Sequence, residues 1–214
     1  MRLDHVSYAI DPGGFSSTVQ RLGSALGASF ADGGVHPRFG TRNFVLALAG
    51  GTYIEVVTTL DHPAADQASF AQAVKHRAGE GGGWLGWVVS VPDIAPVASR
   101  IGRAAMDGHR VRPDGFDLRW KQVGVLDLIQ DPQLPFFIQW LVEPGERPSA
   151  NSIGAGKSRI SCIEIAGDPS TVSAWLGEPD THPLDEIEVR WVAGEPGVIA
   201  VHFAPPQGGT VRID

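Results

Sequence analysis

Two side chains suited to chemistry stand on two short apolar segments near the start of the chain. His5 lies in LDHVSYAI and Glu55 in GGTYIEVV. Alternate side chains of a β-strand share a face. The bulkier set of each segment suits a helix-packed face, which leaves His5 and Glu55 on the opposite, concave face. An imidazole and a carboxylate that converge there indicate a metal site or an acid–base pair. The structural alternative is a histidine bonded to a buried carbonyl and a glutamate paired with an arginine such as Arg42.

A second polar cluster follows in the segment HPRFGTRN. It contains His36, Arg38, Thr41 and Asn43. His36 is a candidate general base or a hydrogen-bond partner of an anionic substrate. Arg38 or Arg42 is a candidate bidentate partner of a carboxylate or phosphate. The alternative is loop chemistry, in which the proline and glycine shape a turn and Asn43 satisfies backbone groups.

The second half of the chain offers a weaker set of candidates. Arg119 and Trp120, together with Gln122 and Trp140, alternate along two predicted strands and are candidates for lining a pocket. Aromatic side chains at a period of two belong more often to a core than to a ligand site. We therefore treat Arg119 and Trp120 as candidate substrate-binding residues and keep core packing as the alternative.

These residues depend on elements that recur along the chain. Strands open with LDHVSYAIDP, LGWVVSVPDI and RISCIEIAGDP and close with GGTYIEVV, LPFFIQW and GGTVRI. Internal self-similarity indicates a repeated architecture. In each copy a helix follows the first strand: Gly27 is the predicted cap of the first helix, and the second is predicted over 94–106 with Gly108 as its cap. Asp168 and Pro169 are the predicted start of the third.

The repeats predict an α+β fold. Two βαβββ modules, at residues 1–60 and 84–143, are joined by a helical connector at 61–83 and form one domain over 1–143. Paired modules of this kind make a curved mixed sheet whose concave pocket is the expected ligand site. A third, shorter βαβββ-like unit follows at 157–214. The segment Glu143–Gly156 is rich in Pro, Gly, Ser and Asn and is predicted to be a surface linker.

Composition excludes several classes of partner. The 214 residues carry a formal charge of −7, so no basic surface is predicted for nucleic acid or anionic membranes. The chain has no apolar run of membrane-spanning length and no signal-peptide pattern at its start. Cys162 is the single cysteine and stands among apolar residues, which favours a buried structural thiol. We therefore expect a cytoplasmic protein whose partner is a small molecule.

The combination HP…GTRN…YIE, with LDHVSYAI before it and FDLRW and LPFFIQW after it, resembles the vicinal oxygen chelate superfamily. That superfamily includes glyoxalase I, extradiol dioxygenases, and fosfomycin- and bleomycin-resistance proteins. The chain looks most like its glyoxalase-like group, over residues 2–142, and the resemblance is looser beyond. It implies a divalent metal such as zinc, nickel, manganese or iron on the concave face. By position the implied ligands are His5, Glu55, the site of Gly86, and Gln139.

The implied metal site is incomplete. Gly86 has no ligand atom, and Gln139 offers only a neutral amide oxygen. A ring-cleaving dioxygenase is disfavoured because one histidine is in place where such an iron site needs two. In the third unit the matching positions are Ile160 and Ile213, so that unit is expected to carry no metal chemistry.

Two functions follow as hypotheses. In the first, a metal on His5, Glu55 and Gln139 polarises an oxygen of a small substrate and His36 moves the proton, as in a lyase, isomerase or epimerase. In the second, the metal-free cavity sequesters a small molecule, as bleomycin-resistance proteins do. Superfamily members pair their modules within one chain or between two chains, so a homodimer is also an expectation.

Overall fold

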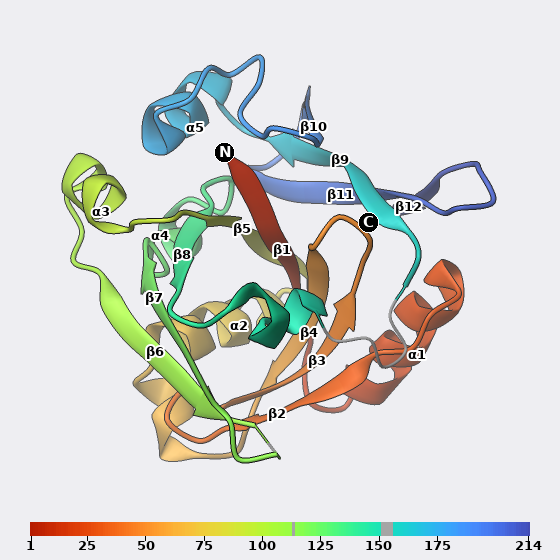
Figure 1. Cartoon of the computed structure of the whole chain (residues 1–214), viewed down its shortest axis with the longest axis vertical. Helices are drawn as coiled ribbons and strands as arrows, with labels where there is room; N and C mark the ends of the chain where they lie inside the picture. Colours follow the sequence, from red (N-terminus) through yellow and green to blue (C-terminus); the bar gives the residue numbers. More distant parts are fainter. Residues whose placement is uncertain (113, 151–155) are drawn as a thin grey trace.

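The computed structural model describes residues 1–112, 114–150 and 156–214, and the strands of these residues form two sheets. The larger, mixed sheet has eight strands in the order β2-β3-β4-β1-β5-β8-β7-β6, and the smaller has four in the order β10-β9-β11-β12. Figure 1 shows the larger sheet curling round on itself, with the smaller sheet to one side of it. The predicted α+β fold with a curved mixed sheet is confirmed.

The first module has the predicted element order. Its elements are β1 (Arg2–Ala9), α1 (Phe15–Leu26), β2 (Ala31–His36), β3 (Thr41–Ala47) and β4 (Tyr53–Thr59). Helix α1 buries Phe15, Leu22 and Leu26 against the sheet. It ends at Gly27, which adopts the left-handed conformation with φ of 62°. Glycine adopts this conformation without steric strain, so the predicted cap is confirmed.

The second module repeats this order with one correction. Its elements are β5 (Gly83–Ser90), α3 (Ala95–Ile101), β6 (Met106–Val111), β7 (Asp117–Val123), α4 (Asp127–Gln130) and β8 (Phe136–Trp140). The helix predicted to run to residue 106 is wrong in its second half, because left-handed Gly102 ends α3. Gly108 lies within β6 instead of capping a helix, and a Cβ there would collide with the Trp120 indole.

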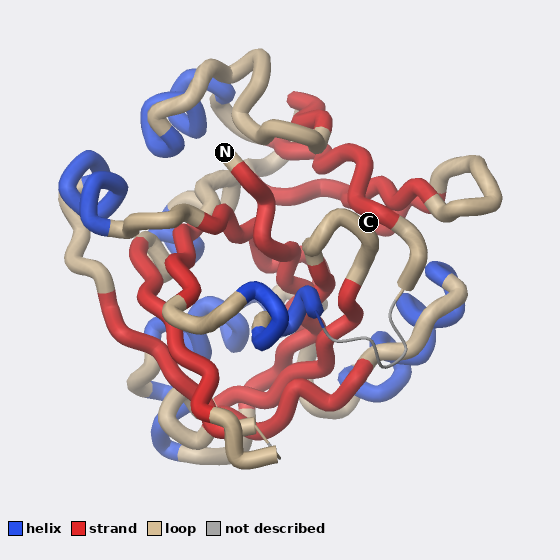
Figure 2. Tube along the Cα trace, in the orientation of Figure 1, coloured by secondary structure: helices blue, strands red, loops and turns tan. Residues whose placement is uncertain are grey.

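The two modules join along β1 and β5, which pair antiparallel with His5 opposite Val88 and Ser7 opposite Gly86. Strand β1 also pairs parallel with β4, and β5 with β8. The far edges of the sheet, β2 and β6, approach each other: the Arg110 Nη1 and His36 Nε2 atoms are 3.4 Å apart. The sheet is therefore nearly closed within one chain, and the strands form a ring in Figure 2.

The connector crosses one end of this ring. It comprises a 3₁₀ turn at Pro63–Asp66 and helix α2 (Ser69–Gly79). Ala73 and Val74 of α2 and Leu128 of α4 pack with apolar side chains of β1, β4, β5 and β8 in one buried cluster. Burial of this apolar surface stabilises the closed end, and the space inside the ring is left between this cluster and the opposite end.

The third unit has the predicted element order but not the strand order of a module. Its elements are β9 (Arg159–Ala166), α5 (Pro169–Leu176), β10 (Glu188–Val192), β11 (Gly197–Ala204) and β12 (Val211–Ile213). The Asp168 carboxylate accepts from the Ser170 backbone N–H at 3.0 Å, which confirms the predicted helix start. Strand β9 lies between β10 and β11, whereas β1 lies beside the last strand of its module.

The smaller sheet packs on the outer face of β1 and β5. Its Ile163, Val201 and Phe203 share one buried cluster with Val6 and Trp87 of the large sheet. The Trp84 indole N–H donates to the Ile213 carbonyl oxygen at 2.9 Å across this contact. The C-terminal unit therefore covers the centre of the large sheet from outside and leaves the inside to the cavity.

The segment predicted as a linker contains 3₁₀ turns at Pro144–Glu146 and Pro148–Ala150, and its residues 151–155 lie outside the described residues. Within the part of the chain that the structure describes, none of the helices has both the length and the apolar character needed to cross a membrane.

Candidate functional site

A cavity lies inside the ring and is lined by both modules. The centre of a water molecule can occupy about 70 Å³ of this cavity. The cavity therefore has room for several waters or one small organic molecule. Strand alternation sends every second side chain inward. The lining residues are His5, His36, Phe39, Thr41, Asn43, Val45, Tyr53, Glu55, Phe70, Arg110, Leu118, Trp120, Gln122, Phe136, Ile138, Trp140 and Pro148.

His5 and Asp4 form a hydrogen-bonded pair at the wall of the cavity. The register of β1 against β5 shifts between Leu3 and His5, so Asp4 is the extra residue of a bulge. A bulge turns a side chain away from the face that alternation gives it. The Asp4 Oδ1 atom lies 2.8 Å from His5 Nδ1, and Trp140 Nε1 donates to Asp4 Oδ2 at 2.8 Å. Both residues are almost completely buried.

The orientation of the His5 ring is set by these contacts. A carboxylate at Nδ1 requires a proton there, so in the neutral ring the lone pair is on Nε2. Tyr53 stacks on the imidazole at 4.3 Å between ring centroids, and Phe136 contacts it edge-on at 6.1 Å. Burial, with the charges of Asp4 and Glu55, raises the pKa of Tyr53, which keeps its phenol protonated. The imidazole is therefore held by rigid neighbours with Nε2 as its free nitrogen.

Glu55 faces His5 across the cavity wall. Its Oε2 atom lies 3.9 Å from His5 Nε2. Ser7 Oγ donates to the same oxygen at 2.9 Å, and Asn43 Nδ2 donates to Oε1 at 2.6 Å. Gly33 leaves room for the Asn43 amide, because a Cβ at Gly33 would collide with it. The carboxylate is therefore hydrogen-bonded by two neutral donors, and the ionisable group within ion-pair distance of it is the His5 imidazole.

His36 and Arg110 meet at the seam between β2 and β6. The side chain of His36 is partly buried, and its Nδ1 lies 3.4 Å from Thr41 Oγ1. Burial, helped by the charge of Arg110, lowers the pKa of His36 from 6.5 to about 4. The ring is therefore neutral at physiological pH, and its Nε2 atom faces the Arg110 guanidinium.

Three predicted site residues lie elsewhere. The Gln139 amide binds the backbone at the start of α3: Nε2 donates to the Pro92 carbonyl at 3.0 Å and Oε1 accepts from the Ile94 N–H at 3.1 Å. Arg38 is exposed, and Arg119 is exposed with its Nε donating to Asp117 at 2.7 Å. The structure brings His5, His36, Thr41, Asn43, Glu55 and Trp120 together at the cavity and does not bring these three to it.

Sequence reasoning missed Asp4 and Arg110. Alternation puts Asp4 on the face opposite His5, and only the bulge in β1 reverses this. Arg110 lies on β6, in the segment HRVRP, but its contact with His36 joins residues 74 positions apart. Strand alternation within HRVRP was a usable signal for its inward direction, whereas nothing local indicates that β6 lies beside β2.

The donor set does not fit a protein-held divalent metal. With Gly86 matched to His5, Ser7 is equivalent to Val88, and the parallel pairs Ser7–Glu55 and Val88–Phe136 then make Glu55 equivalent to Phe136. At Gly86, the equivalent of His5, a Cβ would lie 3.0 Å from the Leu128 side chain. Apolar groups thus fill the second pair of ligand positions. In the described ranges no three His, Cys, Asp or Glu side chains are grouped as a metal site.

Comparison with known proteins assigns the family. Residues 3–179 match the family described as glyoxalase-like domain, and the chain belongs to that family. The predicted glyoxalase-like resemblance is confirmed. A search of curated proteins finds no match.

Similar solved structures include methylmalonyl-CoA epimerases. The enzyme from Mycobacterium tuberculosis is 17% identical with a TM-score of 0.44, and the alignment covers 65% of this chain and 86% of that one. A Streptomyces coelicolor epimerase in complex with 2-nitronate-propionyl-CoA is 17% identical with a TM-score of 0.42, over 65% and 96%. A hypothetical protein from Bacillus halodurans is 12% identical with a TM-score of 0.41, over 65% and 92%.

Proposed function

We propose that this glyoxalase-like protein is an enzyme that moves a proton on a small carbonyl compound, as an isomerase, epimerase or lyase. The observation that carries the proposal is the Asp4–His5 pair. A buried carboxylate that holds Nδ1 leaves Nε2 as a base, and it stabilises the imidazolium that forms when the base takes a proton.

The proposed proton transfer uses the His5 and Glu55 side chains at the cavity wall. The proton of a carbon next to a carbonyl passes to His5 Nε2, and the C–H bonding electrons move toward the carbonyl oxygen. In an isomerase the proton then returns to another carbon. In an epimerase a solvent water protonates the other face of the planar intermediate and His5 gives its proton to solvent. In a lyase the proton stays on the ring while a leaving group departs with its bonding electrons. Glu55, at 3.9 Å from Nε2, is the nearest further acceptor for the proton. In this scheme Asp4 is a positioning residue and His5 the catalytic one.

The metal-dependent form of the hypothesis makes a separate prediction. A divalent metal on His5, Glu55 and Gln139 would polarise the substrate oxygen, but Gln139 binds the backbone of residues 92 and 94 instead. The proton transfer proposed above therefore uses no metal ion. Elemental analysis of untagged protein beside a His5→Ala/Glu55→Ala variant decides between the two. One equivalent of metal that is lost in the variant would favour the metal-dependent enzyme.

Sequestration of a ligand is the second candidate function. The observation that favours it is the aromatic wall contributed by both modules: Phe39 of the first stacks with Trp120 of the second at 6.1 Å, and Trp120 contacts Trp140 at 5.8 Å. Aromatic faces of this kind hold planar apolar groups. A binder needs these walls and does not need the Asp4–His5 pair.

Hydrogen–deuterium exchange separates the two functions. Small ketones, aldehydes and 2-oxo acids are incubated with the protein in D₂O, and loss of the α-proton signal is followed by NMR. We expect exchange with at least one compound, slowed about 10²- to 10⁴-fold in His5→Gln, the range of general base catalysis, and less in Asp4→Asn. His109→Gln, on the exposed part of β6, is the matched control. Exchange that survives in His5→Gln would show that His5 is not the base.

We also propose a cytoplasmic location, which the buried free thiol of Cys162 supports. A homodimer stays a proposal. The site does not depend on it, because β1 and β5 join both modules within one chain.

A further inference from the structure

Arg110 is the one arginine or lysine among the described residues that line the cavity. It comes from β6, at the seam with β2, and lines the wall beside His36. Burial lowers its pKa, against the opposing effects of Tyr53 and Glu55, but a guanidinium stays protonated in proteins. Among the described residues no carboxylate lies within ion-pair distance of it. The nearest recorded contact is His36 Nε2 at 3.4 Å.

The hydrogen-bonding groups of the cavity are unequally satisfied. Both oxygens of Asp4 are occupied by His5 and Trp140, and both oxygens of Glu55 by Ser7 and Asn43. Arg110 has five N–H donors and one neutral acceptor. A partly buried guanidinium without a partner is unfavourable. Two single acceptors, Asn43 Oδ1 and His5 Nε2, are also unused. The unused donors of the cavity are concentrated on the Arg110 guanidinium, and they require acceptor oxygens from a ligand.

The apolar walls beside Arg110 restrict the shape of that ligand. Phe39 and Trp120 are nearly parallel, with 25° between their planes. The cavity has room for one small organic molecule. A planar oxyanion that fits the fork of a guanidinium, attached to a flat apolar body, matches both the donors and the walls.

We propose that the cavity binds small planar carboxylates, with the carboxylate held bidentately by Arg110 and the flat body against the aromatic wall of Phe39, Trp120 and Trp140. This deepens the proposed function and rests on its assumption that the cavity is the ligand site. The competing reading of the same cavity is a cation held by Asp4 and Glu55 among aromatic faces, and it makes the opposite prediction.

Three benzene derivatives of similar size and different charge test the preference: anionic benzoate, neutral benzamide and cationic benzylamine. Binding is measured by tryptophan fluorescence and calorimetry on the full chain. We expect benzoate to bind about 10- to 100-fold more tightly than benzamide, the range of hydrogen bonds to a charged group. In Arg110→Gln benzoate should fall to the level of benzamide while benzamide is unchanged. Arg110→Lys, which keeps the charge but not the fork, should be intermediate.

Arg119→Gln is the matched control, because Arg119 is exposed on the neighbouring strand β7 and does not line the cavity. Melting curves check that each variant is folded. Benzylamine binding more tightly than benzoate, benzoate binding that survives in Arg110→Gln, or no binding of any probe would each overturn the proposal. His5→Gln should keep benzoate binding while it loses proton exchange, so failure of the catalytic proposal is distinguished from failure of this one.

Discussion

The two halves of the large sheet share a backbone plan and differ in the side chains that face the cavity. When the modules are aligned with Gly86 matched to His5, the strand registers make three further pairs of positions equivalent: Ser7 with Val88, Asn43 with Gln122, and Glu55 with Phe136. The first half carries the hydrogen-bonded carboxylates and the imidazole. The second half carries apolar groups at three of these four positions and adds Arg110 and the tryptophans.

This difference shows that pairing of the strands and construction of a polar site place different demands on the sequence. Ladder hydrogen bonds involve only the backbone, so both halves pair alike. A buried carboxylate needs its own donors, and Ser7 and Asn43 provide them only in the first half. The equivalent pair in the second half is Val88 and Gln122, and the Gln122 amide oxygen accepts from Trp120 Nε1 at 2.9 Å. Proton chemistry is therefore expected from the first half and ligand packing from the second.

The same substitution at two equivalent positions tests the comparison most strongly. Glu55→Leu leaves two buried donors, Ser7 Oγ and Asn43 Nδ2, without partners, so we expect a loss of about 3 kcal/mol in the free energy of unfolding. Phe136→Leu removes only part of an apolar contact and should cost about 1 kcal/mol. Urea unfolding of both variants gives the values. Equal losses would show that the two halves do not differ in this way.

His36 connects the halves and makes the stability depend on pH. Its pKa is about 4 in the folded protein and 6.5 unperturbed. Between these values the unfolded chain binds a proton that the folded chain does not, so stability falls as pH falls from 6.5 to about 4. His36→Gln should remove about 3 kcal/mol of this fall, the free-energy equivalent of the difference between the two pKa values. Urea unfolding at a series of pH values measures it, and exposed His109→Gln should leave the slope unchanged.

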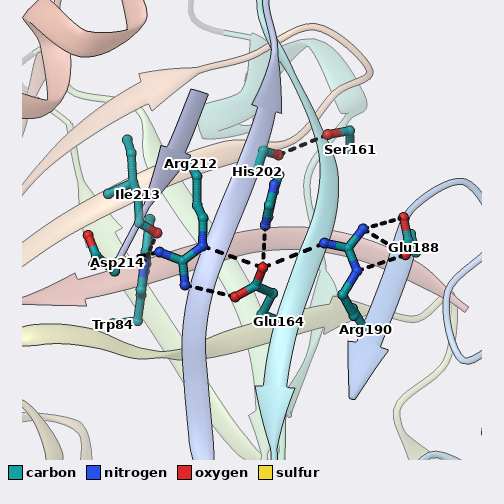
Figure 3. A network of polar contacts seen from close by, with 9 residues as sticks. All are labelled: Trp84, Ser161, Glu164, Glu188, Arg190, His202, Arg212, Ile213 and Asp214. Carbon is teal, nitrogen blue, oxygen red and sulfur yellow. Dashed lines mark hydrogen bonds and ion pairs between the residues drawn. The ribbon is translucent and has the colours of Figure 1, made fainter. Parts of the chain in front are cut away.

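A third carboxylate, Glu164 on the smaller sheet, is stabilised in another way. It accepts from Arg212 Nη2 at 2.8 Å and pairs with His202 Nε2 at 2.7 Å, with Arg190 at 3.6 Å (Figure 3). Hydrogen bonds from Arg212 and then His202 lower the pKa of Glu164 from 4.5 to about 2. Glu55 is held by neutral donors inside the ring, whereas Glu164 is held by cations at the surface of a sheet.

The smallest expected effect belongs to this network. Glu164→Gln should lose about 1 kcal/mol at neutral pH, because solvent screens pairs whose arginines are exposed. A lowered folded pKa gives stability that is present above 4.5 and is lost as pH falls through about 2. The unfolding curves of Glu164→Gln and the unsubstituted protein should therefore converge below pH 4.5. Glu188→Gln, which breaks only a contact to exposed Arg190, is the control. A constant difference down to pH 2 would contradict the assignment.

Much of the fold could be predicted because strand alternation and helix-capping residues are visible in short segments of the sequence. Alternation in LDHVSYAI and TYIEVV indicates which side chains share a face, and the structure places His5 and Glu55 at the cavity. Gly27 ends α1 because glycine adopts the left-handed conformation, and Asp168 begins α5 because its carboxylate caps the first turn. These features depend on neighbours a few residues away, so a single sequence contains them. The helix predicted to reach residue 106 failed because Gly102 ends it first.

The remaining features depend on contacts that no local pattern contains. The bulge that turns Asp4 toward His5 arises from pairing with β5, more than eighty residues away. The approach of β6 to β2 brings Arg110 to His36, and it follows from the curvature of the whole sheet. The order β10-β9-β11-β12 of the smaller sheet likewise depends on which strands pair in the folded chain. The sequence by itself determined the elements and the faces of their side chains. The tertiary structure decided which faces meet, because strand pairing and sheet curvature are properties of the assembled chain.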